Sequence, residues 1–169
     1  YLRAIAQEQY SELGVLIRNK NDQDSFMNLF KSFLKNDQKI DLTLIPSNLP
    51  ELSNNFGGIF LGDPQLGNYS ILRSNFGHHL YSLIGITHTT MSKGIMDFIS
   101  EILIKPVQEW DSLICTSKCV KNSVDSLLID YQKVLSDRIN IKNITLPELP
   151  IIPLGVHTED FDFDEDDKL

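Results

Sequence analysis

Disulfides, long apolar runs and positive charge are all scarce in this sequence of 169 residues. Its two cysteines, Cys115 and Cys119, are too few for the disulfide scaffold of a small secreted domain. No apolar run approaches the roughly 18 residues of a membrane-spanning helix, and no basic-then-apolar signal opens the chain. We therefore expect a cytoplasmic globular protein with no transmembrane segment, in which both cysteines are reduced and buried.

Negative charge exceeds positive charge, and most of the excess lies at one end. The chain has 23 acidic and 15 basic residues, a formal net charge of −8. Residues 159–169 hold seven acids and one lysine, a net of −6, which leaves −2 for all the others. Binding to nucleic acid or to an anionic membrane requires positive charge that displaces counterions, so we expect neither partner.

Apolar residues recur with two periods along the chain. Helical spacing, with a return every three or four positions, occurs over 26–34, 95–103 and 120–134. A further helix, with Leu2 to Leu13 on its apolar face, and a strand at Val15–Ile17 are predicted to open the chain. Short apolar runs predict the other strands, at Ile40–Ile45, Gly58–Leu61, Tyr81–Thr87, Leu113–Cys115 and Pro150–Leu154.

Short polar side chains mark where the predicted helices begin. Asp24 or Ser25 is expected to cap the first, Ser92 the second, and Thr116 with Ser117 the third. Strands with little polar alternation, separated by helices, indicate a parallel sheet that is covered on both faces. The sequence therefore predicts an α/β, Rossmann-like domain over residues 1–154, followed by a connecting segment and acidic tail over 155–169.

Ligands of such folds bind beyond the carboxyl ends of the strands, which directs attention to His88. His88 follows a predicted strand and lies between Thr87 and Thr89, so a neutral imidazole there could hydrogen-bond a hydroxyl-rich ligand or a phosphate. A hydrogen bond to a neighbouring loop carbonyl is the alternative role.

Several well-known site signatures are missing. The chain has no G-x-G-x-x-G and no phosphate-binding G-x-x-x-x-G-K-[ST], and Gly57-Gly58 is expected to form only a turn, which disfavours a dehydrogenase. The adjacent His78 and His79 lack the spacing of zinc ligands, so no metal is expected. The alternating acids Asp162, Asp164, Asp166 and Asp167 lack the central glycine and final glutamate of a calcium loop, which favours a solvated linker.

Three segments share their order and spacing with motifs of one enzyme family. Residues 81–92 (YSLIGITHTTMS) match a strand and loop that end in Thr-His-Thr/Ser. Residues 110–118 (WDSLICTSK) match a D-x-[LIV]-[LIV]-x-x-S strand before a capped helix, and residues 150–161 (PIIPLGVHTEDF) match an I-P-x-G-V-D-x-x-x-F crossing segment. In these features the chain resembles the N-terminal domain of group-1 retaining glycosyltransferases, which have the two-domain GT-B architecture.

The resemblance implies transfer of a sugar from a nucleotide-sugar donor to an acceptor, with retention of configuration and without a metal or other cofactor. The N-terminal domain of the family mainly forms the acceptor side of the cleft. The family's C-terminal donor-binding domain has no counterpart in this chain, and its first strand and glycine-rich loop find no match before Tyr1. We therefore expect both ends to be cut and the isolated chain to be inactive.

The resemblance also implies roles for individual residues. His88 matches the family histidine that reaches the donor sugar and the reacting centre. The residues expected to contact substrate are Thr87, Thr89, Arg73, Thr116 and Ser117, with a surface salt bridge as the alternative for Arg73. Gly155, Val156 and His157 fall in the interdomain segment, although His157 stands where the family usually has Asp. The competing hypothesis is a non-catalytic α/β binding or scaffold module.

Overall fold

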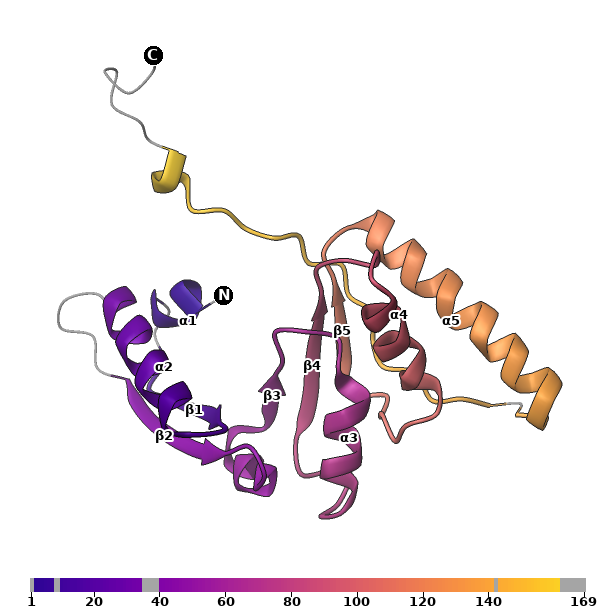
Figure 1. Cartoon of the computed structure of the whole chain (residues 1–169), viewed down its shortest axis with the longest axis horizontal. Helices are drawn as coiled ribbons and strands as arrows, with labels where there is room; N and C mark the ends of the chain where they lie inside the picture. Colours follow the sequence, from indigo (N-terminus) through magenta and orange to yellow (C-terminus); the bar gives the residue numbers. More distant parts are fainter. Residues whose placement is uncertain (1, 8–9, 35–39, 142, 162–169) are drawn as a thin grey trace.

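The computed structural model describes residues 2–7, 10–34, 40–141 and 143–161. Strands and helices alternate along this part of the chain (Figure 1), and every strand pairing in it is parallel, with helices on both sides, which confirms the α/β, Rossmann-like class. In chain order the elements are α1 (Leu2–Gln7), β1 (Glu12–Ile17), α2 (Lys20–Phe33), β2 (Asp41–Pro46), the 3-10 helix η1 (Pro50–Phe56), β3 (Gly58–Phe60), α3 (Leu66–Ser74), β4 (Ser82–Thr87), α4 (Lys93–Ser100), the 3-10 helix η2 (Glu101–Leu103), β5 (Ser112–Cys115), α5 (Lys118–Ile139) and the 3-10 helix η3 (Thr158–Phe161).

The strands are divided between two small sheets, where the sequence pattern predicted one. β1 pairs with β2, and a second sheet has the order β3-β4-β5. Figure 1 shows β1 and β2 running across the view, whereas β3, β4 and β5 run up it. Periodicity along the chain predicts which residues form strands, but it does not encode which strands lie side by side.

The main core lies in the second sheet and the helices around it. β4 is the middle strand, and its residues Leu83 and Ile86 are almost fully buried, as is Leu113 on β5. Helices α3, α4 and α5 enclose these strands with apolar side chains that include Leu66, Ile99, Val124 and Leu128. No helix in the described part of the chain is both long enough and apolar enough to cross a membrane.

The start of the chain departs from its predicted boundaries. Helix α1 ends at Gln7, and β1 begins at Glu12, so Leu13 lies on a strand rather than on a helical face. Helix α2 begins at Lys20, earlier than the caps Asp24 or Ser25 would place it. Asn19 is the actual cap, and its side-chain oxygen accepts a hydrogen bond from the amide of Asp22 at 3.0 Å.

Elsewhere the predicted caps Ser92 of α4 and Ser117 of α5 are confirmed, whereas Thr116 bonds to the carbonyl of Thr87 and does not cap α5. The last predicted strand is reduced to single bridges. Over Pro150–Leu154 only Ile151 forms a bridge, to Cys115 on β5. The prolines at 150 and 153 have no N–H to donate to a ladder, which explains why the pairing does not extend.

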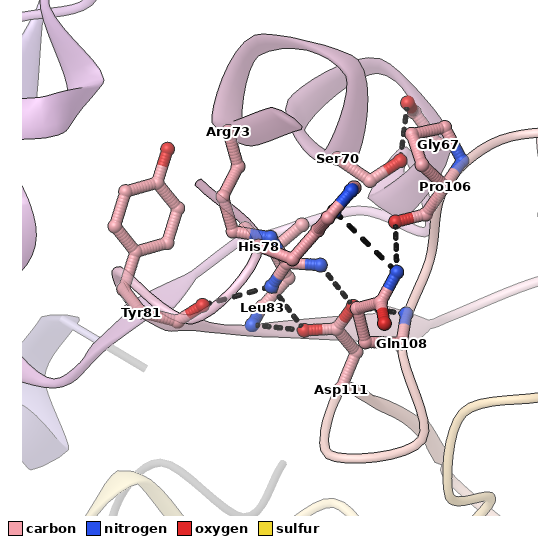
Figure 2. Close-up of polar contacts among 9 residues, drawn as sticks. All are labelled: Gly67, Ser70, Arg73, His78, Tyr81, Leu83, Pro106, Gln108 and Asp111. Carbon is pink, nitrogen blue, oxygen red and sulfur yellow. Dashed lines mark hydrogen bonds and ion pairs between the residues drawn. The ribbon is translucent and has the colours of Figure 1, made fainter. Parts of the chain in front are cut away.

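A fully buried ion pair joins α3 to the start of β5 (Figure 2). Both side chains have 0% exposure, and the Arg73 guanidinium meets the Asp111 carboxylate through two bonds, of 2.6 and 2.7 Å. This bidentate geometry is the strongest form of a charge-assisted hydrogen bond. Arg73 is therefore part of the interior framework, and neither a contact with an acceptor nor a surface salt bridge describes its position.

The same pair also holds the polypeptide at the amino ends of β4 and β5. Arg73 Nη1 donates to the carbonyl of Tyr81 at 2.8 Å, and the Asp111 carboxylate accepts from the amides of Leu83 and Gln108, each at 2.8 Å. Its own carbonyl accepts from the amide of Glu148 at 2.8 Å. The Asp111 carboxylate thus fixes the start of β4 and the loop before β5, and the main-chain carbonyl of Asp111 holds the returning C-terminal segment.

Removing one member of this pair should be costly, because it leaves an unpaired charge in the core. We expect Arg73→Met to lower the free energy of unfolding by about 3–5 kcal/mol, measured by urea denaturation. Lys121→Met is the control: it breaks the partly exposed pair with Asp125 on α5 and should cost below about 1 kcal/mol. A loss for Arg73→Met no larger than that of the control would contradict this role.

Candidate functional site

The carboxyl ends of β4 and β5 bring together most of the predicted site residues. Thr87, the last residue of β4, lies in register with Cys115, the last residue of β5. The loop after β5 is tied to β4, because Thr116 Oγ1 donates a hydrogen bond to the carbonyl of Thr87 at 3.1 Å. The two loops that lead into α4 and α5 therefore lie at one edge of the sheet.

His88 is exposed at this edge, directly after the buried end of β4. Its neighbour Thr89 is also exposed, and the Thr89 hydroxyl accepts a hydrogen bond from the amide of Met91 at 3.1 Å, which closes the loop. Thr87 is fully buried instead, and its hydroxyl has no hydrogen-bond partner among the described residues. The strand thus supplies a rigid base, and the exposed residue His88 follows directly after it.

Two helices begin at the same edge. Ser92 Oγ accepts from the amide of Ile95 at 3.4 Å to cap α4, and Ser117 Oγ accepts from the amide of Val120 at 3.1 Å to cap α5. The amide groups of a helix's first turn carry partial positive charge, so these ends favour oxygen-rich or anionic ligands. Thr116 and Ser117 are half-buried, which leaves part of each within reach of a ligand.

The C-terminal segment leaves from this edge as well. The amide of Cys115 donates to the carbonyl of Pro150 at 2.8 Å, and the amide of Ile152 donates to the carbonyl of Cys115 at 3.0 Å. Beyond this point Gly155 and Val156 are exposed and His157 is half-buried, and Figure 1 shows the segment extending away from the sheet. The tail residues Asp162, Asp164, Asp166 and Asp167 lie outside the described residues.

Arg73 is the predicted site residue that the structure places elsewhere. It lies at the amino ends of β4 and β5, whereas His88, Thr116 and Ser117 follow their carboxyl ends. The parallel sheet therefore separates two polar regions, one buried and structural, the other exposed and open to ligands.

The remaining histidines and cysteines show no sign of a reactive or metal-binding role. His79 stacks on Trp110, with ring centroids 4.6 Å apart, and the described residues contain no metal-binding group of three or more His, Cys, Asp or Glu. Both cysteines are free thiols. Burial raises the pKa of the Cys115 thiol, which suits a small core residue, but Cys119 is exposed, contrary to the expectation that both are buried.

A cavity of about 560 Å³ lies away from His88. It opens between β1 and β3, and residues from Glu12 to Leu16 and from Gly58 to Asp63 line it. No local pattern in the sequence predicts this cavity, because it arises from the placement of two sheets. The same holds for the Arg73–Asp111 contact, whose partners are 38 residues apart.

No family model, no curated protein and no solved structure matches this chain. The arrangement of residues at the carboxyl edge is therefore the evidence from which a function can be proposed.

The strand that carries His88 depends on a glycine. A Cβ added at Gly85 would lie 3.0 Å from the carbonyl oxygen of Asp63 and 3.2 Å from Leu66 Cδ2. We expect Gly85→Ala to lower the free energy of unfolding by about 1–3 kcal/mol, measured by urea denaturation. A Cβ added at Gly94 on α4 would have no atom within 4 Å, so Gly94→Ala should instead raise the free energy of unfolding by up to about 1 kcal/mol. Equal stability of the two variants would show that β4 tolerates a side chain at position 85.

Proposed function

We propose that this chain is the acceptor-side half of a retaining glycosyltransferase of the GT-B architecture, which takes its sugar from a nucleotide-sugar donor. The observation that supports the proposal best is the position of His88, exposed at the carboxyl end of the middle strand of a parallel sheet. Open α/β sheets bind their ligands at this edge.

The chemistry of the edge suits a sugar that carries a phosphate leaving group. An imidazole can donate one hydrogen bond and accept another when neutral, and it can pair with a phosphate when protonated. The hydroxyls of Thr89 and Ser117 and the first turns of α4 and α5 add further polar groups nearby. In this proposal His88 orients the sugar and stabilises the charge that develops on the reacting groups, without acting as a nucleophile.

The direction of the C-terminal segment is compatible with a second domain across a cleft. Residues 150–152 are fixed beside β5, and the exposed segment that follows, with Gly155, Val156 and His157, begins at the edge that carries His88. A donor-binding domain attached through this segment would face His88 across the cleft.

Replacement of His88 tests the proposal in a polypeptide that includes the donor-binding half. We expect His88→Ala to lower turnover about 100-fold or more and to leave the unfolding midpoint unchanged, because the side chain is exposed. His79→Ala is the matched control, since His79 is also exposed but precedes β4, at the opposite end of the strand. We expect that variant to retain full turnover.

Three results decide between the enzyme and the binding or scaffold module. Loss of turnover in His88→Ala alone supports the enzyme and the role of His88. Unchanged turnover in both variants contradicts the proposed role of His88 but not the proposal that the protein is an enzyme. The absence of sugar transfer by the unmodified polypeptide with every nucleotide-sugar tested favours the module.

The isolated 169-residue chain should have no transferase activity. The proposed function needs a donor-binding surface opposite His88, which in this proposal a separate donor-binding domain supplies. We expect no transfer of radiolabelled sugar above background with the isolated chain, measured alongside the larger polypeptide as a positive control. Measurable transfer by the isolated chain would show that it binds the donor by itself.

A further inference from the structure

The cavity of about 560 Å³ between β1 and β3 has walls that are mostly apolar. Apolar residues of three elements line it: Leu2 and Ile5 of α1, Leu13 and Val15 of β1, and Ile59 of β3. Sites for small molecules commonly have volumes of about 300–1,000 Å³ and mainly apolar linings. Water finds few hydrogen-bond partners in such surroundings, whereas apolar molecules bind there. The cavity therefore suits an apolar ligand, or the apolar part of a larger one.

The cavity is long, because it follows both strands. Along β1 it is lined by every residue from Glu12 to Leu16, and along β3 by Gly58, Ile59 and Phe60. Residues of a strand rise by about 3.3 Å each, so the five residues of β1 span roughly 13 Å. A single aliphatic chain that lies along the strands fits this shape better than a compact ring system.

Polar side chains line the carboxyl end of the cavity. Arg18 follows β1 and Asp63 follows β3, and both line the cavity, Arg18 exposed and Asp63 half-buried. A guanidinium only donates hydrogen bonds and an ionised carboxylate only accepts them, so together they can bind the hydroxyls of a neutral head group. The exposed Tyr10 and Glu12 line the opposite end, and the wall between the two ends is apolar. This division matches a molecule with an apolar chain and a hydroxyl-bearing head.

The carboxyl end of the cavity lies beside the strand that carries His88. The amide of Leu61 donates to the carbonyl of Ile84 on β4 at 2.7 Å, and the amide of Ile86 donates to the carbonyl of Asp63 at 3.2 Å. Asp63 is thus held against β4 two residues before His88. A head group bound at Asp63 therefore lies at the same edge of the sheet as His88, one strand away.

We propose that the cavity holds the aliphatic chain of the acceptor, and that the hydroxyl-bearing head of this acceptor lies at the carboxyl edge between Asp63 and His88. This inference rests on the proposed function, because it names the class of acceptor: an amphiphile with one alkyl chain instead of a fully polar sugar. The apolar walls bind the chain, while Arg18 and Asp63 orient the head group towards the donor sugar.

Binding of methyl, butyl and octyl β-glucoside to the 169-residue chain tests the proposal, with octyl glucoside kept below the concentration at which it forms micelles. The three probes share one head group and differ only in the length of the chain. We expect the affinity, measured from NMR chemical shifts, to rise by about 100-fold or more from the methyl to the octyl compound. The octyl compound should shift the amides of Leu13, Val15 and Ile59. Equal affinity for the three probes, or shifts centred outside the cavity, would overturn the proposal.

A charge placed in the cavity wall provides a second test. Ile5→Asp should weaken the binding of octyl glucoside about 10-fold or more, because an apolar chain does not compensate a carboxylate for lost water. Ile129→Asp is the matched control, since Ile129 is 64% exposed on α5 and does not line the cavity. Equal affinity of the two variants would also overturn the proposal. If Ile5→Asp does not fold, the comparison of the three probes on the unmodified chain decides alone.

None of these measurements uses a sugar donor, which separates them from the test of the proposed function. Lack of chain-length dependence, together with sugar transfer by the larger polypeptide, overturns the alkyl acceptor and leaves the transferase. Lack of transfer with every nucleotide-sugar contradicts the transferase, and with it the acceptor role of the cavity, even where octyl glucoside binds.

Discussion

The Arg73 guanidinium and the Asp111 carboxylate meet in a region from which water is excluded, and the arrangement of the central sheet depends on this contact. Neither charge is tolerable there alone, because an unpaired charge in the interior costs several kcal/mol. Asp111 also accepts from the amides of Leu83 and Gln108, and Arg73 donates to the carbonyl of Tyr81. Helix α3, the start of β4 and the loop before β5 can therefore adopt few positions relative to one another.

This constraint at the amino end of the sheet also sets the geometry of the carboxyl end. β4 and β5 are in register from Ile84 opposite Ser112 to Thr87 opposite Cys115, so fixing where both strands start fixes where both end. Thr116 then bonds to the carbonyl of Thr87, and the loops with His88 and Ser117 emerge together. One register thus has two consequences. The amino end of the sheet is buried, charged and rigid, and the carboxyl end is exposed and rich in hydroxyl groups, so that it can contact ligands.

Much of this arrangement could be predicted from sequence where the signal is local. Apolar periodicity located the strands that become β2 to β5, and the hydroxyls of Ser92 and Ser117 marked the starts of α4 and α5, because a cap bonds within its own first turn. The position of His88 directly after a strand could also be predicted, because the apolar run that precedes it is a local signal. Arg73 could not be placed, because its partner is 38 residues away and a basic residue on a helix is usually exposed. The division into two sheets was equally hidden, since strand pairing depends on contacts between distant segments.

We propose that ligands bind at the carboxyl edge around His88, whereas the buried region around Arg73 is structural. Chemical-shift mapping by NMR, with a panel of nucleotide-sugars titrated into the polypeptide that includes the donor-binding half, tests it most directly. We expect shifts at His88, Thr89 and Ser117 and none at Arg73 or Asp111. Shifts centred on Arg73 and Asp111, or a complete lack of shifts around His88 with a nucleotide-sugar that binds, would contradict it.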